Sequence, residues 1–179
     1  LVAKPLARGW RAITPEGLRT SVKNFFTNLQ APVRIINATL QGKFAGAGTE
    51  IIRFGTNSTL GLFGLFDPAK DHFGQLPVDE DTGQTLGFYG VGPGPFIVLP
   101  FLGPSNLRDA VGLYADTQMD LARHIWDENK VYIRVRVADA INELSLDKDT
   151  YESIKKDAID PYIFLRNAYI QFRAGAVEK

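Results

Sequence analysis

The segment GVGPGPFIVLPFLGP, Gly90–Pro104, decides how the rest of the chain must be interpreted. Three of its first five residues are glycine, four of its residues are proline, and it carries no charge. The uncharged stretch is longer still, because no Asp, Glu, Lys or Arg occurs between Asp81 and Arg108. Proline and glycine disfavour regular helix, so many amides of this backbone lack helical partners. The segment is either a buried core loop or a surface or cavity wall that meets lipid.

A second apolar stretch, NSTLGLFGLFDPA, spans Asn57–Ala69. Its Leu and Phe residues are separated by Gly61 and Gly64, a spacing that suits neither a regular helix nor an alternating strand. The pattern predicts an apolar hairpin loop that ends at Asp67-Pro68. Two such loops among amphipathic helices indicate a protein whose outer or inner surface meets lipid.

Helical periodicity accounts for much of the remaining chain. Thr14-Pro15 predicts a helix start with Thr as the N-cap, and Ala31-Pro32 predicts the start of a second helix that Gly42 ends. A third, weaker helix is expected over about residues 44–54. Ser105, which follows Gly-Pro, is a plausible N-cap of the next helix.

The C-terminal third contains one ambiguous and one clear pattern. The stretch VYIRVRVADA, residues 131–140, alternates like a strand, but with Ile141 and Leu144 it also suits a helix. Apolar residues recur every three or four positions from Tyr151 to Tyr169, and Pro161 predicts a kink near Asp160. The clear periodicities are all near 3.6, so we predict an all-α fold without a sheet of consequence.

Composition excludes several classes of function. The 179 residues suffice for one domain, and 20 basic residues balance 20 acidic ones, so the footprint of a nucleic-acid-binding protein is missing. The chain contains no cysteine, which excludes disulfides and thiolate chemistry, and His72 and His124 lie too far apart in sequence to suggest a metal site. No apolar run is long enough for a membrane-spanning helix. Because the chain begins at Leu1 without a signal peptide, we expect a mature or trimmed product.

Catalytic motifs are weak or missing. Gly90–Gly94 resembles a phosphate-binding loop, but Pro95 stands where G-x-G-x-x-G requires glycine. No G-x-S-x-G motif of a serine hydrolase occurs. Arg108-Asp109 together with Asp67 could form an acid–base set, although helix-start charges or an ion pair are the favoured interpretation. We therefore predict no catalytic residues, no metal site, no cofactor and no enzymatic activity.

Four stretches carry a resemblance to a known family. They are KNFFTNLQAPVRIINATLQGKF (Lys23–Phe44), RFGTNSTLGLFGLFDPA (Arg53–Ala69), GQTLGFYGVGPGPFIVLPFLGPSNLRD (Gly83–Asp109) and DPYIFLRNAYIQFR (Asp160–Arg173). In this order they resemble the MlaA (VacJ) family of outer-membrane lipoproteins, from about Lys4 to Arg173. The lipid-modified cysteine and the Asp-Pro-x-Glu-Gly-Phe-Asn-Arg-type segment with which that family begins do not occur in this chain. Thr82 stands where the family usually has Phe.

The resemblance implies a fold, a location and a set of partners. The chain would be a single domain, residues 1–179, forming a helical ring embedded in the outer membrane of a Gram-negative bacterium, on its periplasmic side. The full-length precursor would be lipid-anchored. A central amphipathic channel would let mislocalised phospholipid leave the outer leaflet and reach the periplasmic carrier MlaC, and trimeric porins would be partners. The resemblance also implies a helix for residues 131–140.

Within this framework, the two apolar stretches acquire separate expected roles. Gly61, Leu62, Phe63, Gly64, Leu65 and Phe66 would form a hairpin that gates the channel, because their glycines permit hinge-like changes. The membrane- or porin-facing segment would comprise Phe96, Ile97, Val98, Leu99, Phe101 and Leu102. Gly92, Pro93, Gly94, Pro95 and Pro100 would shape the bend that presents it.

Two functions of different classes remain open at this point. The first is a passive conduit for phospholipid, and the alternative is a structural scaffold associated with porins, in which the channel has no role. A phospholipid hydrolase is a third class, but the chain has neither a nucleophile motif nor a metal cluster. The conduit and the scaffold share every feature of the sequence, and lipid inside the ring would favour the conduit.

Overall fold

The computed structural model describes residues 3–99, 102–147 and 160–178. These residues form mostly helices, with one short hairpin of strands. The elements in chain order are α1 (Ala3–Ile13), α2 (Glu16–Leu29), α3 (Ala31–Leu40), α4 (Phe44–Thr59), α5 (Pro68–Asp71), α6 (Thr82–Phe88), β1 (Phe96–Leu99), β2 (Gly103–Asn106), α7 (Leu107–Met119), α8 (Leu121–Ile125), α9 (Asn129–Leu146) and α11 (Pro161–Val177). The prediction of an all-α fold is confirmed.

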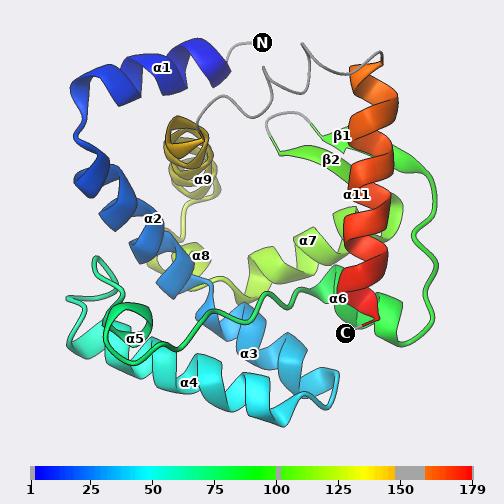
Figure 1. Cartoon of the computed structure of the whole chain (residues 1–179), viewed down its shortest axis with the longest axis horizontal. Helices are drawn as coiled ribbons and strands as arrows, with labels where there is room; N and C mark the ends of the chain where they lie inside the picture. The colour runs from blue at the N-terminus through cyan, green and yellow to red at the C-terminus, as the bar shows by residue number, and fades with distance from the viewer. Residues whose placement is uncertain (1–2, 100–101, 148–159, 179) are drawn as a thin grey trace.

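The helices are arranged around a centre rather than in layers. In Figure 1, α1 and α2 form the left side of the view, α4 with α3 on its inner side forms the lower edge, and α6 and α11 form the right side, while α9 is seen nearly end-on inside them. The helix α9 packs against α1 and α2, α3 packs on α4, and α6 packs on α7. None of the helices within the described ranges combines the length and the apolar character needed to cross a bilayer.

The distribution of side chains is inverted relative to that of an ordinary water-soluble domain. The buried apolar side chains of the described residues are few and mostly alanines. Charged and polar side chains fill much of the interior instead, and Glu50 and Asn37 are completely buried. Large apolar side chains cover the outside, including Phe44 (70% exposed) and Ile51 (57%) on α4.

Several short side chains define where the helices begin. Asp67, Asp81, Asn106, Asp120 and Asp160 each accept a hydrogen bond from a backbone N–H in the first turn of the following helix. Such caps satisfy donors that have no partner within the helix. Because Asp81 and Asp120 also line the interior, capping fixes both the helix ends and the wall of the candidate site.

Four predictions about helix boundaries need correction. Thr14 is buried between α1 and α2 and does not cap α2, which Pro15 precedes. Ser105 lies in β2, and Asn106 is the N-cap of α7, because its side chain reaches the Asp109 amide at 2.8 Å. The third helix extends beyond residue 54 to Thr59.

The fourth correction concerns the C-terminal helix. The chain does not kink within a helix near Asp160: this residue is extended and caps α11, which begins at Pro161. Residues 151–159 of the predicted pattern lie outside the described residues. The stretch 131–140 is helical, within α9, so its strand-like alternation is overruled by packing against α1 and α2.

The uncharged segment Gly90–Pro104 contributes to a two-stranded antiparallel hairpin of β1 and β2 rather than forming an irregular wall. Phe96 pairs with Asn106 and Leu99 pairs with Gly103. The Phe96 ring packs edge-on against Tyr162 and Tyr169 of α11, which attaches the hairpin to that helix. The strands therefore satisfy part of the backbone that helices leave unpaired.

Candidate functional site

Two cavities, each of about 360 Å³ and open to the surface, adjoin each other. They share four lining residues, Leu113 and Thr117 of α7 and Tyr132 and Arg136 of α9. We name them the polar cavity and the apolar cavity after the remaining residues that line them. The four shared residues show that the two cavities lie next to each other.

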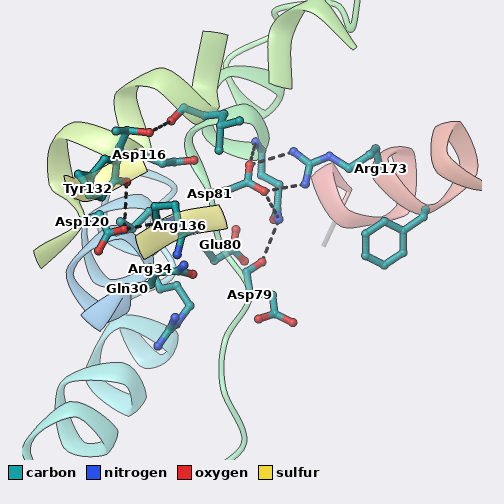
Figure 2. A pocket seen from close by; sticks show the side chains of 15 residues that line it. Gln30, Arg34, Asp79, Glu80, Asp81, Asp116, Asp120, Tyr132, Arg136 and Arg173 are labelled. Carbon is teal, nitrogen blue, oxygen red and sulfur yellow. Dashed lines mark hydrogen bonds and ion pairs between the residues drawn. The ribbon is translucent and has the colours of Figure 1, made fainter. Parts of the chain in front are cut away.

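The polar cavity is lined by charged side chains from five parts of the fold. Five of them are carboxylates and three are arginines, namely Asp79, Glu80, Asp81, Asp116, Asp120, Arg34, Arg136 and Arg173. Figure 2 shows that the three consecutive acidic residues approach from the segment before α6, while Arg173 reaches them from α11. Carboxylates therefore outnumber cations around this space.

The apolar cavity lies on the other side of the shared wall. Leu102 from the β hairpin and Ile133, Val137 and Ala140 from α9 provide its apolar surface. Asp139 and Glu143 of α9 also line it. The spacing of these residues along α9 places one face of the helix on the cavity.

Arg173 holds the polar cavity together on the α11 side. Its Nη1 and Nη2 donate to the Asp81 carboxylate at 2.7 and 2.9 Å, and its Nε donates to Asp109 at 2.7 Å. Burial works against the charge, but the two carboxylates outweigh it and raise the pKa of Arg173 above its usual value. The guanidinium is thus permanently charged, and each of its three nitrogens donates a hydrogen bond to a carboxylate.

Asp109 is the second anchor of this cluster. Burial alone would raise its pKa, but hydrogen bonds from Arg173, Tyr169 and Arg108 lower the pKa below its ordinary value. Tyr169 donates to Asp109 at 2.6 Å, and burial together with this carboxylate raises the pKa of Tyr169 to about 12. Arg108 pairs with the same carboxylate at 2.9 Å, so Arg108-Asp109 is an ion pair, the interpretation favoured by the sequence.

Asp116 differs from the other carboxylates of the polar cavity. It accepts from the amide and hydroxyl of Thr82 and from Asn37, all neutral donors. Burial raises its pKa above the ordinary value, and the hydrogen bonds from Thr82 offset this only in part. Within the described residues, no ion pair neutralises this carboxylate.

Arg136 occupies the wall between the two cavities. Its Nη1 donates to Asp139 at 2.8 Å, and its Nε lies 3.9 Å from Asp120. With its oxygen turned toward the guanidinium, the Gln30 amide accepts from Nη1 and Nη2 at 2.7 and 2.9 Å. Burial raises the pKa of Asp139 to about 6, because Arg136 compensates only part of the desolvation.

A second buried network, remote in sequence from Asp109, supports the apolar loop Asn57–Ala69. Glu50 binds Arg34 at 2.7 Å and accepts from the Val78 amide at 2.8 Å, and Arg53 binds Asp67 at 2.9 Å. Burial tends to raise the pKa of Asp67, but hydrogen bonds from Arg53 and Asn57 outweigh it and lower the pKa. Asp67 and Asp109 therefore belong to separate ion-paired networks and form no shared acid–base set.

The predicted gate hairpin forms a tight apolar turn. Leu62, Phe63 and Gly64 are consecutive residues with positive φ, of 51°, 60° and 94°. The Asn28 side chain fixes this turn by donating to Ser58 at 3.0 Å and to the Phe63 carbonyl at 3.4 Å. Leu62, Phe63 and Phe66 are exposed, whereas Gly61 and Gly64 are buried. No residue from Gly61 to Phe66 belongs to the described lining of the polar or apolar cavity.

The predicted membrane-facing segment is partly exposed. Val98 and Leu102 are each 58% exposed, while Phe96, Ile97 and Leu99 are half-buried. Pro100 and Phe101 lie outside the described residues. The predicted bend residues Gly92, Pro93, Gly94 and Pro95 are all exposed and lead into β1. The carbonyls of Pro93 and Pro95 accept from Arg108 and Leu107, so this bend also closes the start of α7.

Sequence reasoning missed the charged lining of the cavities. A usable signal was present, because Arg136, Asp139 and Glu143 recur at spacings of three and four and share a helical face with Tyr132. Asp116 and Asp120 show the same spacing in the chain after Arg108. Treating residues 131–140 as a possible strand would have placed Arg136 and Asp139 on opposite faces and hidden this pattern.

A sequence model of the MlaA lipoprotein family matches residues 1–176. The chain belongs to the MlaA lipoprotein family. It is 31% identical over 180 residues to the intermembrane phospholipid transport system lipoprotein MlaA of Escherichia coli K12, covering 95% of this chain and 67% of that one. The MlaA lipoprotein of Haemophilus influenzae is 30% identical over 172 residues, covering 95% and 68%.

Structure comparison agrees with the MlaA assignment. A chain solved in a study of the structural basis for maintenance of bacterial outer membrane lipid asymmetry superposes with a TM-score of 0.86 at 30% identity. The match covers 98% of this chain and 88% of the solved one. An uncharacterised protein of Rickettsia conorii is 32% identical over 179 residues, covering 99% and 70%. The all-α MlaA fold is therefore shared over nearly the whole chain.

Proposed function

We propose that this MlaA-family protein is a phospholipid conduit of the outer membrane, which removes mislocalised phospholipid from the outer leaflet and so maintains lipid asymmetry. The observation that carries the proposal is the pair of adjoining cavities, one polar and one apolar, inside a shell with an apolar exterior. A phospholipid has the same division into a polar and an apolar part. Relatives named for intermembrane phospholipid transport support the same function.

The surroundings of the protein follow from the same proposal. The exposed Leu, Ile and Phe side chains would contact acyl chains, chiefly at the inner leaflet, with residues 1–179 acting as one domain on the periplasmic side. A lipid anchor in the full-length precursor would hold it there. The carrier MlaC would receive the lipid in the periplasm, and trimeric porins would bind the apolar exterior, including Val98 and Leu102.

The Gly61–Phe66 turn remains our proposed gate, with a more specific role than the sequence suggested. Its position away from the cavity lining favours control of lipid entry at the membrane surface over closure of the cavities themselves. Transport through these cavities needs no bond to be made or broken, so we propose no catalytic step.

A bulky side chain placed between the two cavities tests the proposed conduit. Thr117 is half-buried and lines both cavities, so Thr117→Trp should place a large ring between them. Thr20→Trp, on an exposed face of α2, is the matched control. In cells that lack the native protein, the conduit predicts that the first variant accumulates to normal levels, co-purifies with less phospholipid and fails to restore asymmetry, while the control restores it.

The scaffold alternative makes the opposite prediction for the same pair. If the ring serves only to organise porins, Thr117→Trp should keep porin association and restore asymmetry as well as Thr20→Trp does. A correctly folded Thr117→Trp protein with full activity would therefore contradict the conduit.

A further inference from the structure

The inference concerns the charged residue at the boundary between the two cavities. Of the four residues that line both, Leu113, Thr117 and Tyr132 carry no charge near neutral pH, and Arg136 is the cation. In a phospholipid, the phosphodiester lies at the junction of the head group and the acyl region. The position of Arg136 in the protein therefore corresponds to the position of the phosphate in the lipid.

Arg136 is also the least restrained arginine of the polar cavity. Its side chain is 30% exposed, against 10% for Arg34 and 10% for Arg173. Arg173 is held by two carboxylates, and Arg34 is held by Glu50 and the Thr27 carbonyl. Arg136 has one close carboxylate partner, Asp139 at 2.8 Å, a more distant one, Asp120 at 3.9 Å, and a neutral amide partner, Gln30.

An arginine in this setting suits a phosphodiester. The planar guanidinium presents parallel N–H donors that match two phosphate oxygens, and such charge-assisted bonds are stronger than neutral ones. The Gln30 amide can turn away when an anion arrives, since it is neutral.

The charge of the polar cavity restricts which head group follows the phosphate. Asp79 is exposed and has neither a hydrogen bond nor an ion pair to its carboxylate within the described residues, and Asp116 is bound by neutral donors alone. Of the remaining cavity carboxylates, Glu80 and Asp81 are paired with Lys43 and Arg173, and Asp120 lies 3.9 Å from Nε of Arg136. The uncompensated charge is therefore negative, which attracts an ammonium group and repels an anionic one.

Resting on the proposed conduit, we propose that Arg136 binds the phosphodiester of the transported lipid and that the polar cavity favours a zwitterionic head group bearing an ammonium group. The acyl chains would then lie against Ile133, Val137 and Ala140 on the same helix. One face of α9 would thus contact both parts of the ligand.

The test uses the full-length protein in detergent, stripped of lipid and reloaded from micelles containing equal amounts of phosphatidylethanolamine and phosphatidylglycerol, with bound lipid counted by native mass spectrometry. Removing Arg136 alone would leave Asp139 without its cation. The informative comparison is therefore the double variant Arg136→Gln/Asp139→Asn against Asp139→Asn alone. Arg166→Gln, an exposed change on α11, is the control for loss of one positive charge.

The proposal predicts about a tenfold loss of bound phospholipid in the double variant relative to Asp139→Asn, as expected for a lost charge-assisted contact. Arg166→Gln should bind as the wild type does, and Arg136→Lys should retain an intermediate amount. The wild type should prefer phosphatidylethanolamine, and Asp79→Asn/Asp116→Asn should raise the share of phosphatidylglycerol. Glycerophosphoethanolamine, which lacks acyl chains, should not displace the lipid at the same concentration.

Other outcomes distinguish a failure of the inference about Arg136 from a failure of the proposed conduit. If the double variant unfolds at the same temperature as Asp139→Asn and binds as much lipid, Arg136 does not bind the phosphate and the inference is wrong. Equal wild-type loading of both lipids, or displacement by the soluble head group, also overturns it. If the wild type binds neither phospholipid, the proposed conduit itself fails, independently of Arg136.

Discussion

The outer surface of this protein and the interfaces between its helices, here called the seams, are built from opposite kinds of residue. In the seams, Glu50, Arg53 and Asp120 are nearly or fully buried, whereas on the surface Phe63 and Phe44 are 76% and 70% exposed. Water would favour the reverse arrangement, since it solvates charges and excludes apolar side chains. This arrangement supports the proposed membrane location, in which the medium outside the helices would be apolar and the polar medium would lie inside.

The energetic roles of the two regions differ accordingly. Apolar helix faces gain nothing by packing together when lipid surrounds them, so specific packing and polar contacts between helices must hold the structure. The Arg34–Glu50 ion pair joins the consecutive helices α3 and α4, and Arg173–Asp81 joins α11 to the N-cap of α6, 92 residues away. A buried charge without its partner is costly, so these pairs fix the arrangement of the helices. Substitutions in one region can therefore be tested while the other region is left intact.

The largest effect is expected from Glu50→Ala. The change leaves Arg34 and Arg53 without a shared carboxylate and the Val78 amide without its acceptor. Breaking a buried pair from one side should lower the free energy of unfolding by about 3–5 kcal/mol, measured by chemical denaturation in detergent. Glu178→Ala, on an exposed residue, should change it by less than about 0.5 kcal/mol. Similar losses in both variants would remove the contrast between seam and surface.

A charge on the outer surface should act on membrane association rather than on folding. We expect Val98→Asp to weaken association with membrane or porin by about 2–4 kcal/mol at depth, because a carboxylate would enter hydrocarbon. Val98 is 58% exposed, so unfolding in detergent should change little. Extraction from membranes and porin co-purification measure the first effect, with Val98→Thr as an uncharged control. Unchanged behaviour of Val98→Asp in both assays would show that this segment faces neither lipid nor porin.

The apolar turn joins the two regions and should tolerate no added side chain. A Cβ atom at Gly64 would lie 2.4 Å from Cβ of Asn28, and the positive φ disfavours other residues. Gly64→Ala should therefore lower the free energy of unfolding by about 2–3 kcal/mol. Gly48→Ala in α4, where nothing lies within 4 Å of the new atom, should be neutral or stabilising by up to about 1 kcal/mol.

This geometry changes the expected behaviour of valine at the turn. Because a Cβ at Gly61 would also lie 2.5 Å from the Asn57 and Phe66 carbonyl oxygens, Gly61→Val should reduce protein abundance. Trapping the gate without loss of protein therefore requires another position. Asn28→Ala, which frees the turn from its hydrogen bonds, should alter asymmetry at nearly normal abundance if the turn is a gate. Normal asymmetry in this variant would argue against gating.

The smallest effect is a pH dependence from Asp139. Its folded pKa of about 6 lies above the ordinary value near 4, so the folded state binds a proton more tightly than the unfolded state does. Stability from this group is highest below about pH 4 and is lost as pH rises through about 6. Asp139→Asn should therefore stabilise the protein by about 1–2 kcal/mol at pH 7.5 and by much less at pH 4.5, as measured by thermal unfolding. An equal effect at both pH values would show that the shift is not a property of the folded protein.

The sequence predicted the fold class and most helices, and it predicted the site poorly. Local signals were sufficient where proline, glycine and periodicity agree, as in the helix from Ala31 to Leu40 that Gly42 ends at φ 73°. They failed where partners are distant. Phe96–Leu99 is a strand because Gly103–Asn106 pairs with it. The sequence of the uncharged segment alone does not specify the register of this pairing.

The site depends even more on distant partners. Arg173 and Asp81 are 92 residues apart and meet at 2.7 Å, a juxtaposition that periodicity cannot reveal. The apolar loops, in contrast, could be recognised from the sequence, because a long run of residues without charge is unusual in itself. The sequence therefore directed attention to the outer surface, while the charged interior required the three-dimensional arrangement.

The most direct test of the central claim measures which medium each region contacts in a bilayer. Because the chain has no cysteine, single-cysteine variants can carry a spin label at chosen positions. In full-length protein reconstituted in phospholipid bilayers, labels at Val98 and Phe44 should be more accessible to oxygen, which concentrates in lipid, than to a water-soluble nickel complex. Labels at Asp79 and Thr117 should show the opposite preference. Nickel accessibility at Val98 and Phe44 equal to that at Asp79 would contradict the account, because the apolar exterior would then face water.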